Sequence, residues 1–115
     1  MFSLVFPGQG SQTIGMGKDF FENYDLVKDL FKEADESLGI SLSKIILEGP
    51  KDELDLTVNT QPAIFLISYS IFQVMKKEFN MDLDNAKYFA GHSLGEYSAL
   101  CAANYLDFSD TIKLL

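Results

Sequence analysis

The residues whose types and spacing most clearly suggest chemistry are 91–95, which read Gly-His-Ser-Leu-Gly and fit the Gly-x-Ser-x-Gly pattern of a nucleophile elbow. A short apolar run precedes them and an alanine-rich helical pattern follows, so we predict a strand, a sharp turn and a helix. In such a turn the Ser93 hydroxyl is exposed at the tip, and the Leu94 N–H lies at the helix start, where it can bind an oxyanion. The residues therefore predict a nucleophilic serine. The alternative is a glycine-rich turn with an ordinary N-cap serine.

A serine nucleophile needs a base that accepts its proton, and that base normally comes from another segment of the fold. His92 is the only histidine of the chain, and it directly precedes Ser93. Because neighbouring residues in a tight turn point in different directions, we interpret His92 as a hydrogen-bonded structural residue beneath the turn. A Ser-His mechanism would then take its histidine from outside these residues.

Two further segments could contribute to an acyl site. Residues 8–12 form a glycine-rich loop at the exit of the first expected strand, and such loops can donate a second oxyanion N–H. A plain glycine turn is the alternative, and the loop does not match the Gly-x-Gly-x-x-Gly pattern of dinucleotide sites. Gln61 precedes Pro62 at an expected helix start, where it either makes a structural hydrogen bond or lines an acyl pocket.

Charge and composition argue against several other functions. The chain has 17 acidic and 9 basic residues, all nine of them lysine, so we expect no nucleic-acid binding and no guanidinium clamp for a carboxylate. The single histidine, the single cysteine and the scattered acids predict no metal site, and we expect no cofactor. Cys101 is interpreted as a small buried apolar residue. Without a signal peptide or a membrane-length apolar stretch, we expect a cytoplasmic protein with no membrane contact.

The elements that position these residues follow from apolar periodicity and from helix start and stop signals. Apolar runs predict short buried strands over residues 2–6 and about 87–90. Helical spacing predicts helices over residues 15–22, 25–38 and about 94–104. A further helix, apolar on nearly all faces, is expected to begin near Pro62 and to run to about residue 79. Residues 51–58 fit a loop or a short helix, and Asp107 or Ser109 is placed to cap a last helix.

The number of strands bears on the completeness of the domain. Two strands flanked by helices cannot make a covered parallel sheet, and the last helix opens only about one turn before residue 115, without a stop signal. We therefore predict an α/β fold that is the front piece of a larger, incomplete domain. A complete small domain that ends in a frayed helix is the alternative.

Three separated segments together carry a family resemblance. They are residues 5–12 (Val-Phe-Pro-Gly-Gln-Gly-Ser-Gln), 59–63 (Asn-Thr-Gln-Pro-Ala) and 91–100 (Gly-His-Ser-Leu-Gly-Glu-Tyr-Ser-Ala-Leu). In this order and spacing the chain resembles the malonyl-CoA:acyl carrier protein transacylases, from residue 2 to the end. The resemblance implies that residues 1–115 are part of one domain, the N-terminal portion of an α/β-hydrolase-like large subdomain with short parallel strands and flanking helices. The family's small ferredoxin-like subdomain would follow later.

The resemblance also implies an acyl transfer with a covalent intermediate. Ser93 would take malonyl from malonyl-CoA as an ester and pass it to the phosphopantetheine thiol of acyl carrier protein, in fatty acid biosynthesis. The backbone N–H groups of Gln9 and Leu94 would form the oxyanion hole, and Leu94 fits malonyl rather than methylmalonyl specificity. Gln61 matches a position near the family's active site, so it is a candidate substrate-binding residue.

The chain departs from the family's pattern in two respects. The family's arginine, which pairs with the malonyl carboxylate, and its catalytic histidine are both absent from these residues and are expected beyond residue 115. We therefore expect negligible transferase activity from the chain alone. The alternatives are an acyltransferase domain of a polyketide synthase, a non-catalytic fragment of a transacylase, and a simple hydrolase, because esterases share the elbow.

Overall fold

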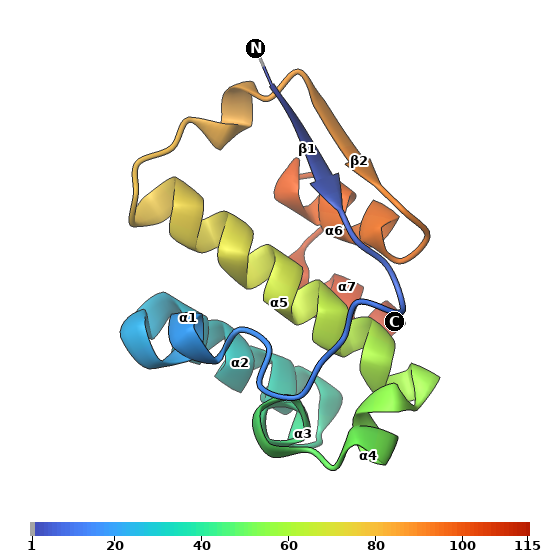
Figure 1. Ribbon diagram of the computed structural model, residues 1–115. Helices are drawn as coiled ribbons and strands as arrows, with labels where there is room; N and C mark the ends of the chain where they lie inside the picture. The colour runs from blue at the N-terminus through green and yellow to red at the C-terminus, as the bar shows by residue number, and fades with distance from the viewer. Residues whose placement is uncertain (1) are drawn as a thin grey trace.

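The computed structural model describes residues 2–115, in which two short strands and several helices surround one long helix. In chain order the elements are β1 (Ser3–Phe6), α1 (Lys18–Asn23), α2 (Asp25–Leu38), α3 (Leu42–Glu48), α4 (Lys51–Asp55), α5 (Thr57–Lys77), η1 (Leu83–Asn85), β2 (Tyr88–Gly91), α6 (Gly95–Ala102) and α7 (Phe108–Leu114). Helix α5 runs diagonally through the centre, with the strands and α6 on one side and α1, α2 and α3 on the other (Figure 1). It contacts α2, α4, α6 and α7.

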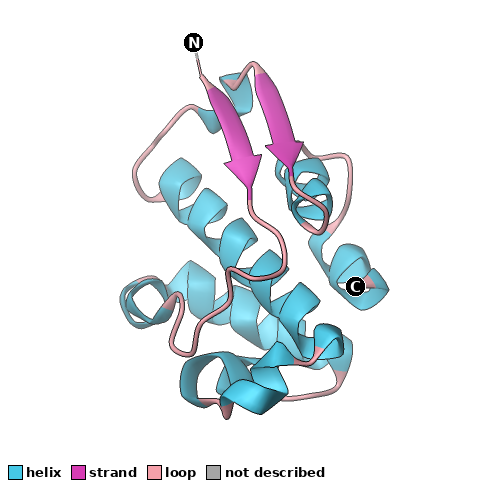
Figure 2. Cartoon of the chain, turned by 45° about the vertical axis from the view of Figure 1, so that its right-hand side comes forward, coloured by secondary structure: helices cyan, strands magenta, loops and turns pink. Residues whose placement is uncertain are grey.

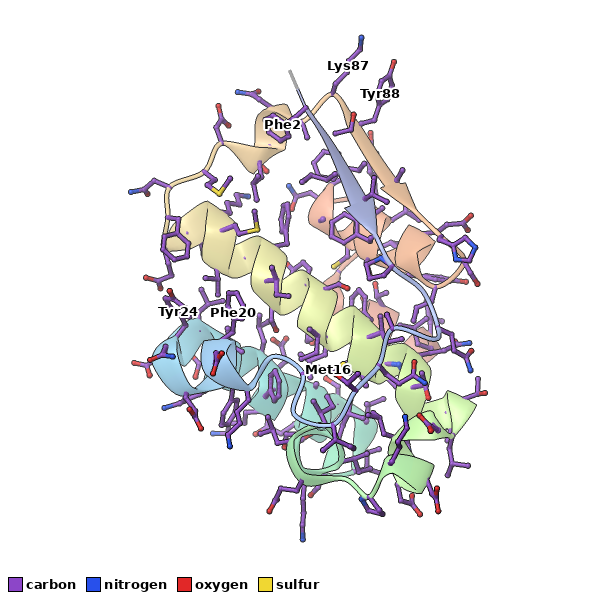
Figure 3. All side chains as sticks on the ribbon, in the orientation of Figure 1. Phe2, Met16, Phe20, Tyr24, Lys87 and Tyr88 are labelled. Atoms are coloured by element: carbon purple, nitrogen blue, oxygen red, sulfur yellow. The ribbon has the colours of Figure 1, made fainter. Side chains whose placement is uncertain are left out.

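The two strands pair in parallel (Figure 2), and the register places Phe6 of β1 opposite Gly91 of β2. Because parallel strands end at the same edge, the loop after β1 and the turn after β2 lie side by side. The expected burial of both strands is wrong within the described residues. Val5 is 75% exposed and Tyr88 is 61% exposed, and Tyr88 projects away from the helices (Figure 3). Helices α5 and α6 cover only the face that carries Phe6.

Helix α5 begins at Thr57, five residues before the expected start at Pro62, which lies inside the helix. Two buried side chains stabilise the turn that precedes the proline. The Asn59 Nδ2 donates to the Glu53 carbonyl at 2.8 Å. The single hydroxyl hydrogen of Thr60 is shared between the carbonyls of Leu54 and of Leu56, the latter 3.0 Å from the Oγ1. These bonds tie α4 to α5 and override the tendency of proline to mark a helix start.

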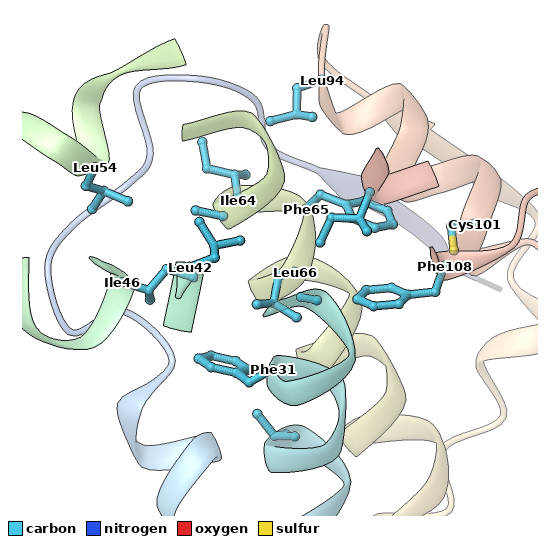
Figure 4. Close-up of a cluster of buried hydrophobic side chains, with 14 of the residues drawn as sticks. Phe31, Leu42, Ile46, Leu54, Ile64, Phe65, Leu66, Leu94, Cys101 and Phe108 are labelled. Carbon is cyan, nitrogen blue, oxygen red and sulfur yellow. The ribbon is translucent and has the colours of Figure 1, made fainter. Parts of the chain in front are cut away.

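The main core lies where α5 faces the helices around it. Its buried members include Phe31 of α2, Leu42 of α3, Phe65 of α5 and Phe108 of α7 (Figure 4). Each fully buried side chain of this size contributes about 1.5–3 kcal/mol to folding. The expectation that α5 is buried on several sides is confirmed. A second cluster, which includes Phe6, packs between the strands and α5 and α6.

The helix ends follow the sequence signals in part. Helix α2 spans the expected residues, and Gly39 ends it with a φ of 70°, in the left-handed region that favours glycine. Asp107, rather than Ser109, is the N-cap of α7, where its carboxylate accepts a hydrogen bond from the Asp110 N–H at 3.2 Å. Helix α1 begins three residues later than expected, and residues 51–55 adopt the helical alternative.

None of the helices in residues 2–115 combines the length and the apolar character needed to cross a membrane.

Candidate active site

The turn between β2 and α6 has the geometry of a nucleophile elbow. Ser93, at its tip, has a φ of 55° and therefore adopts the left-handed backbone conformation, although it is not a glycine. For a residue other than glycine this conformation costs about 1–3 kcal/mol, and such strained residues cluster at functional sites. The Ser93 side chain is exposed. The turn therefore presents a hydroxyl to solvent on a backbone that the surrounding structure must hold in place.

The two glycines of the pattern are required by close backbone approach. A Cβ at residue 91 would overlap the Gly95 carbonyl group, so a side chain there would push α6 away from β2. A Cβ at residue 95 would overlap the Phe6 carbonyl group, so a side chain there would separate α6 from β1. The spacing Gly-x-Ser-x-Gly thus lets the first turn of α6 pack directly on the ends of both strands.

Backbone hydrogen bonds close the turn. The His92 N–H donates to the Phe6 carbonyl at 3.1 Å, which extends the parallel pairing by one residue. The Gly95 N–H donates to the His92 carbonyl at 3.0 Å, and the Glu96 N–H donates to the Ser93 carbonyl at 3.0 Å. These bonds hold the left-handed Ser93 between the end of a strand and the start of a helix.

Leu94 connects the turn to the core. The residue is 4% exposed, and its side chain lies in the main core cluster with Ile64 and Phe65 (Figure 4). Its N–H stands at the N-cap of α6, where the helix dipole favours negative charge. Within the described residues this N–H has no protein acceptor. A donor of this kind can bind an oxyanion that forms on an acyl group attached to Ser93.

The glycine-rich loop after β1 lies against the elbow, as the shared strand edge predicts. A Cβ at Gly8 would overlap the His92 carbonyl, so the two segments are in direct contact. Inside the loop, the Ser11 Oγ donates to the Gly8 carbonyl at 2.9 Å, and the Gln12 Oε1 accepts from the Gly10 N–H at 2.8 Å. Gln9 is exposed between these fixed points, and its N–H has no protein acceptor among residues 2–115.

Comparison with known proteins agrees with this geometry. The sequence pattern of the family described as "Acyl transferase domain" matches residues 3–115. The chain belongs to the acyl transferase domain family. It is 47% identical, over 99% of its length, to the malonyl CoA-acyl carrier protein transacylase of Haemophilus influenzae, of which it covers 36%. The resemblance to this group of transacylases is confirmed, with the chain matching their N-terminal third.

Solved structures show the same likeness. An acyl carrier protein S-malonyltransferase from Vibrio cholerae aligns with a TM-score of 0.92 and 45% identity, over 98% of this chain and 36% of that one. A malonyl-transacylase in complex with its type II polyketide acyl-carrier protein aligns with a TM-score of 0.89 and 40% identity, over 98% and 36%. This acyl transferase segment thus spans about a third of the length of the relatives it matches, and it shares their fold over that third.

The histidine of the elbow is not placed as expected. The His92 side chain of this acyl transferase segment is exposed, and the described residues offer it no hydrogen-bond partner. The interpretation of a hydrogen-bonded histidine beneath the turn is therefore wrong. The hydrogen bonds that hold the turn come from the backbone N–H and carbonyl of His92, and the described residues around Gly8 leave the residue exposed instead of covering its ring.

Gln61 lies half-buried in the second turn of α5, and the described residues give its side chain no hydrogen bond. The structure therefore does not bear out the structural hydrogen bond that was one reading of this residue. A largely apolar hollow of about 410 Å³ lies beside the contact between β1 and α5, and its lining includes Phe6, Ile71 and Phe72. Neither Gln61 nor Ser93 is among its lining residues, so this hollow does not unite the candidate residues.

Cys101 is buried in α6, as its alanine-rich surroundings predict, and the residue is 2% exposed. Burial raises the pKa of this thiol to about 12, and the charge of Asp107 acts in the same direction. The thiol therefore stays protonated and unreactive at neutral pH. Glu96 is exposed in the first turn of α6, where its charge is favourable next to the helix N-terminus. Residues 2–115 contain no group of three or more potential ligands that could hold a metal ion.

Sequence reasoning missed the residues that support the glycine-rich loop. Gln12 reaches from the loop to Asp55 at the end of α4, where its Nε2 donates to the Oδ1 at 3.1 Å. Gln12, two residues after Gly10, could have been recognised in the sequence as a side chain that supports the loop. No pattern in the sequence indicates its partner, which lies 43 positions away.

Proposed function

We propose that this chain is part of an enzyme that transfers malonyl from malonyl-CoA to acyl carrier protein, in fatty acid biosynthesis. The observation that carries the proposal is the left-handed, exposed Ser93 at a strand-to-helix turn, in a chain that belongs to the acyl transferase domain family. In the first step the Ser93 Oγ attacks the thioester carbonyl of malonyl-CoA and a base takes the hydroxyl proton. The carbon–sulfur bond breaks, and coenzyme A leaves as the thiol.

The backbone around the serine supports this role. Negative charge develops on the carbonyl oxygen during the attack, and two N–H donors without protein acceptors, those of Gln9 and Leu94, lie on the segments that flank Ser93. In the second step the phosphopantetheine thiol of the carrier attacks the carbonyl of the Ser93 ester and the base takes the thiol proton. The carbon–oxygen bond to Ser93 breaks, the base returns the proton to the serine oxygen, and malonyl leaves as a thioester of the carrier. Gln61 remains a candidate substrate contact on the strength of the family resemblance alone.

One face of the two-stranded sheet is exposed in residues 2–115, and the chain spans about a third of the length of its relatives. Residues 1–115 form part of a single α/β-hydrolase-like large subdomain whose further elements cover the exposed strands. The chain holds no arginine, and its single histidine, His92, is an exposed residue of the turn itself, directly next to Ser93. The base that activates Ser93 and the cation that pairs with the malonyl carboxylate are therefore supplied by other residues of the complete enzyme.

A chimera provides the test. Residues 1–115 replace the matching segment of the Haemophilus influenzae transacylase, to which they are 47% identical. The chimera is mixed with malonyl-CoA, quenched and digested, and the malonylated peptide is located by mass spectrometry. We expect one malonyl group on Ser93, and its transfer to acyl carrier protein when the carrier is added.

Two serine variants make the test specific. Ser93→Ala removes the nucleophile and should abolish labelling, whereas Ser41→Ala removes an exposed hydroxyl that makes no capping bond and should leave labelling unchanged. Malonyl on another residue, or label that survives Ser93→Ala, would refute the assignment. The 115-residue chain alone should label at least about a hundredfold more slowly, because general base catalysis contributes about 10²–10⁴-fold.

A second candidate is malonyl supply to a polyketide carrier, because one aligned transacylase structure contains a type II polyketide carrier. The two candidates share the Ser93 ester and differ only in the acceptor. Transfer from the labelled chimera to a fatty-acid carrier and to a type II polyketide carrier, measured in parallel, distinguishes them by the ratio of the two rates.

A further inference from the structure

The side chain of Gln12 connects the glycine-rich loop to helix α4. Its Oε1 accepts a hydrogen bond from the Gly10 N–H at 2.8 Å, inside the loop. Its Nε2 donates to the Asp55 Oδ1 at 3.1 Å, at the last residue of α4. One amide group therefore bridges the segment that carries Gln9 and an element that belongs to the helical part of the fold.

The chemistry of the partner fixes the direction of this bridge. An ionised carboxylate only accepts hydrogen bonds, so Asp55 requires the NH₂ end of the Gln12 amide. The carbonyl end is then left for the Gly10 N–H. The hydrogen bond from Gln12, and next that from Lys51, hold the pKa of Asp55 below its usual range, so the carboxylate stays ionised at neutral pH. The amide thus has one orientation that satisfies both of its neighbours.

The far end of the bridge is anchored. The Lys51 Nζ lies 3.2 Å from the carboxylate of Asp55, one helical turn away on α4. Helix α4 is tied in turn to α5 by the bonds from Asn59 and Thr60 to the carbonyls of Glu53 and Leu54. The Gln12 amide therefore connects the loop to an element that is packed against the central helix.

Gln9 lies between two points that are held by different means. On one side, Gly8 packs against the His92 carbonyl of the elbow. On the other, Gly10 has a φ of 109° and is held through its N–H by Gln12. Gln9 itself is exposed, so its own side chain is not packed in the core. The direction of its N–H is therefore set by the positions of Gly8 and Gly10.

We propose that Gln12 and Asp55 are positioning residues that hold the Gln9 N–H toward the acyl oxygen on Ser93. The proposal rests on the proposed function only for the identity of the acyl group. The hydrogen-bonded bridge from Gly10 through Gln12 to Asp55 concerns only the conformation of the loop, so it can be tested without any turnover.

Three variants probe the bridge. Gln12→Met keeps the length of the side chain and removes both hydrogen bonds. Asp55→Ala removes the anchor. The double variant Gln12→Glu with Asp55→Asn exchanges the donor and the acceptor of the hydrogen bond between residues 12 and 55. The new carboxylate at position 12 then accepts from both the Gly10 N–H and the new amide at position 55. Asp52→Asn is the matched control, because it changes a second exposed carboxylate of α4 that makes no hydrogen bond to the loop.

The first readout is amide hydrogen exchange of Gln9 and Gly10, measured by NMR in the 115-residue chain. We expect exchange at Gly10 to rise about tenfold in Gln12→Met and in Asp55→Ala, which corresponds to the loss of one hydrogen bond. The double variant should return to within about twofold of the wild type, and Asp52→Asn should not differ from it. Unchanged exchange in Gln12→Met, or a double variant as fast as Gln12→Met, overturns the bridge.

The second readout is the rate of Ser93 malonylation in the chimera. A displaced oxyanion donor affects the transition state rather than substrate binding, so kcat should fall about tenfold in Gln12→Met while KM for malonyl-CoA stays unchanged. A rise in KM at constant kcat refutes the positioning role. If no variant, wild type included, is malonylated at Ser93, the proposed function fails and the exchange data alone decide the bridge.

Discussion

Replacing Gly95 with alanine tests the contact on which the elbow depends. The added methyl group would overlap the Phe6 carbonyl, a backbone atom that cannot rotate away, so α6 must move from β1. Such overpacking costs about 3 kcal/mol, and losing the His92 N–H bond to that same carbonyl adds about 1 kcal/mol. Alanine returns about 1 kcal/mol through its helix propensity. The net expected loss is about 3 kcal/mol, a large part of the stability of a small domain.

Urea unfolding of the 115-residue chain, followed by circular dichroism, measures this loss of stability. With a slope of about 1.5 kcal/mol per molar urea, the midpoint should fall by about 2 M. The control is Gly39→Ala, where φ is 70° and a Cβ meets no atom within 4 Å. There only the left-handed backbone opposes the alanine, and the expected cost is about 1 kcal/mol. If Gly95→Ala is as stable as the wild type, or no less stable than the control, the close approach of α6 to β1 is refuted.

Three further outcomes are expected. Ser93→Gly should raise stability by about 0.5–1 kcal/mol in urea unfolding, because glycine relieves the left-handed strain, and should abolish malonylation of the chimera; a destabilised variant contradicts the strain. Stability should fall as the pH rises from about 9 towards 12, because the Cys101 thiol ionises near pH 9 when unfolded but has a pKa of about 12 in the fold; urea midpoints at pH 8 and 10 check this, and Cys101→Ala should lessen the fall. Asp107→Ala should cost about 1 kcal/mol through the lost N-cap of α7, measured by the same unfolding assay, with Asp110→Asn as a control that keeps the cap.

The elbow could be predicted from sequence because its pattern describes local backbone geometry. Positions 91 and 95 require glycine because a side chain there would overlap backbone atoms. The order of strand, turn and helix follows from the flanking residues. The parallel pairing of the strands was expected from the family resemblance, and it places the loop that leaves β1 beside the turn that leaves β2. The family membership of the chain was predicted from three segments that are far apart in the sequence.

Other features depend on tertiary contacts that no local pattern contains. Pro62 marks a helix start only when no stable turn precedes it, and here the side chains of Asn59 and Thr60 stabilise such a turn through α4. Val5 lies in an apolar run that predicted a buried strand, yet only one face of the sheet is covered within the described residues. Whether His92 is exposed depends on which segments pack around the turn, and the periodicity of the sequence does not show that packing.

The placement of Leu94 and Gln9 has a consequence for local opening. The Leu94 amide belongs to a residue whose side chain is fixed among Ile64 and Phe65, so it can change direction only when the core itself opens. The Gln9 amide sits on an exposed loop, and reorienting it requires breaking surface hydrogen bonds alone. Free energies of local opening range from near zero in loops to the global value in the core. On warming, the Gln9 side of the site should therefore lose its alignment well before the Leu94 side, at temperatures where the fold as a whole is still intact.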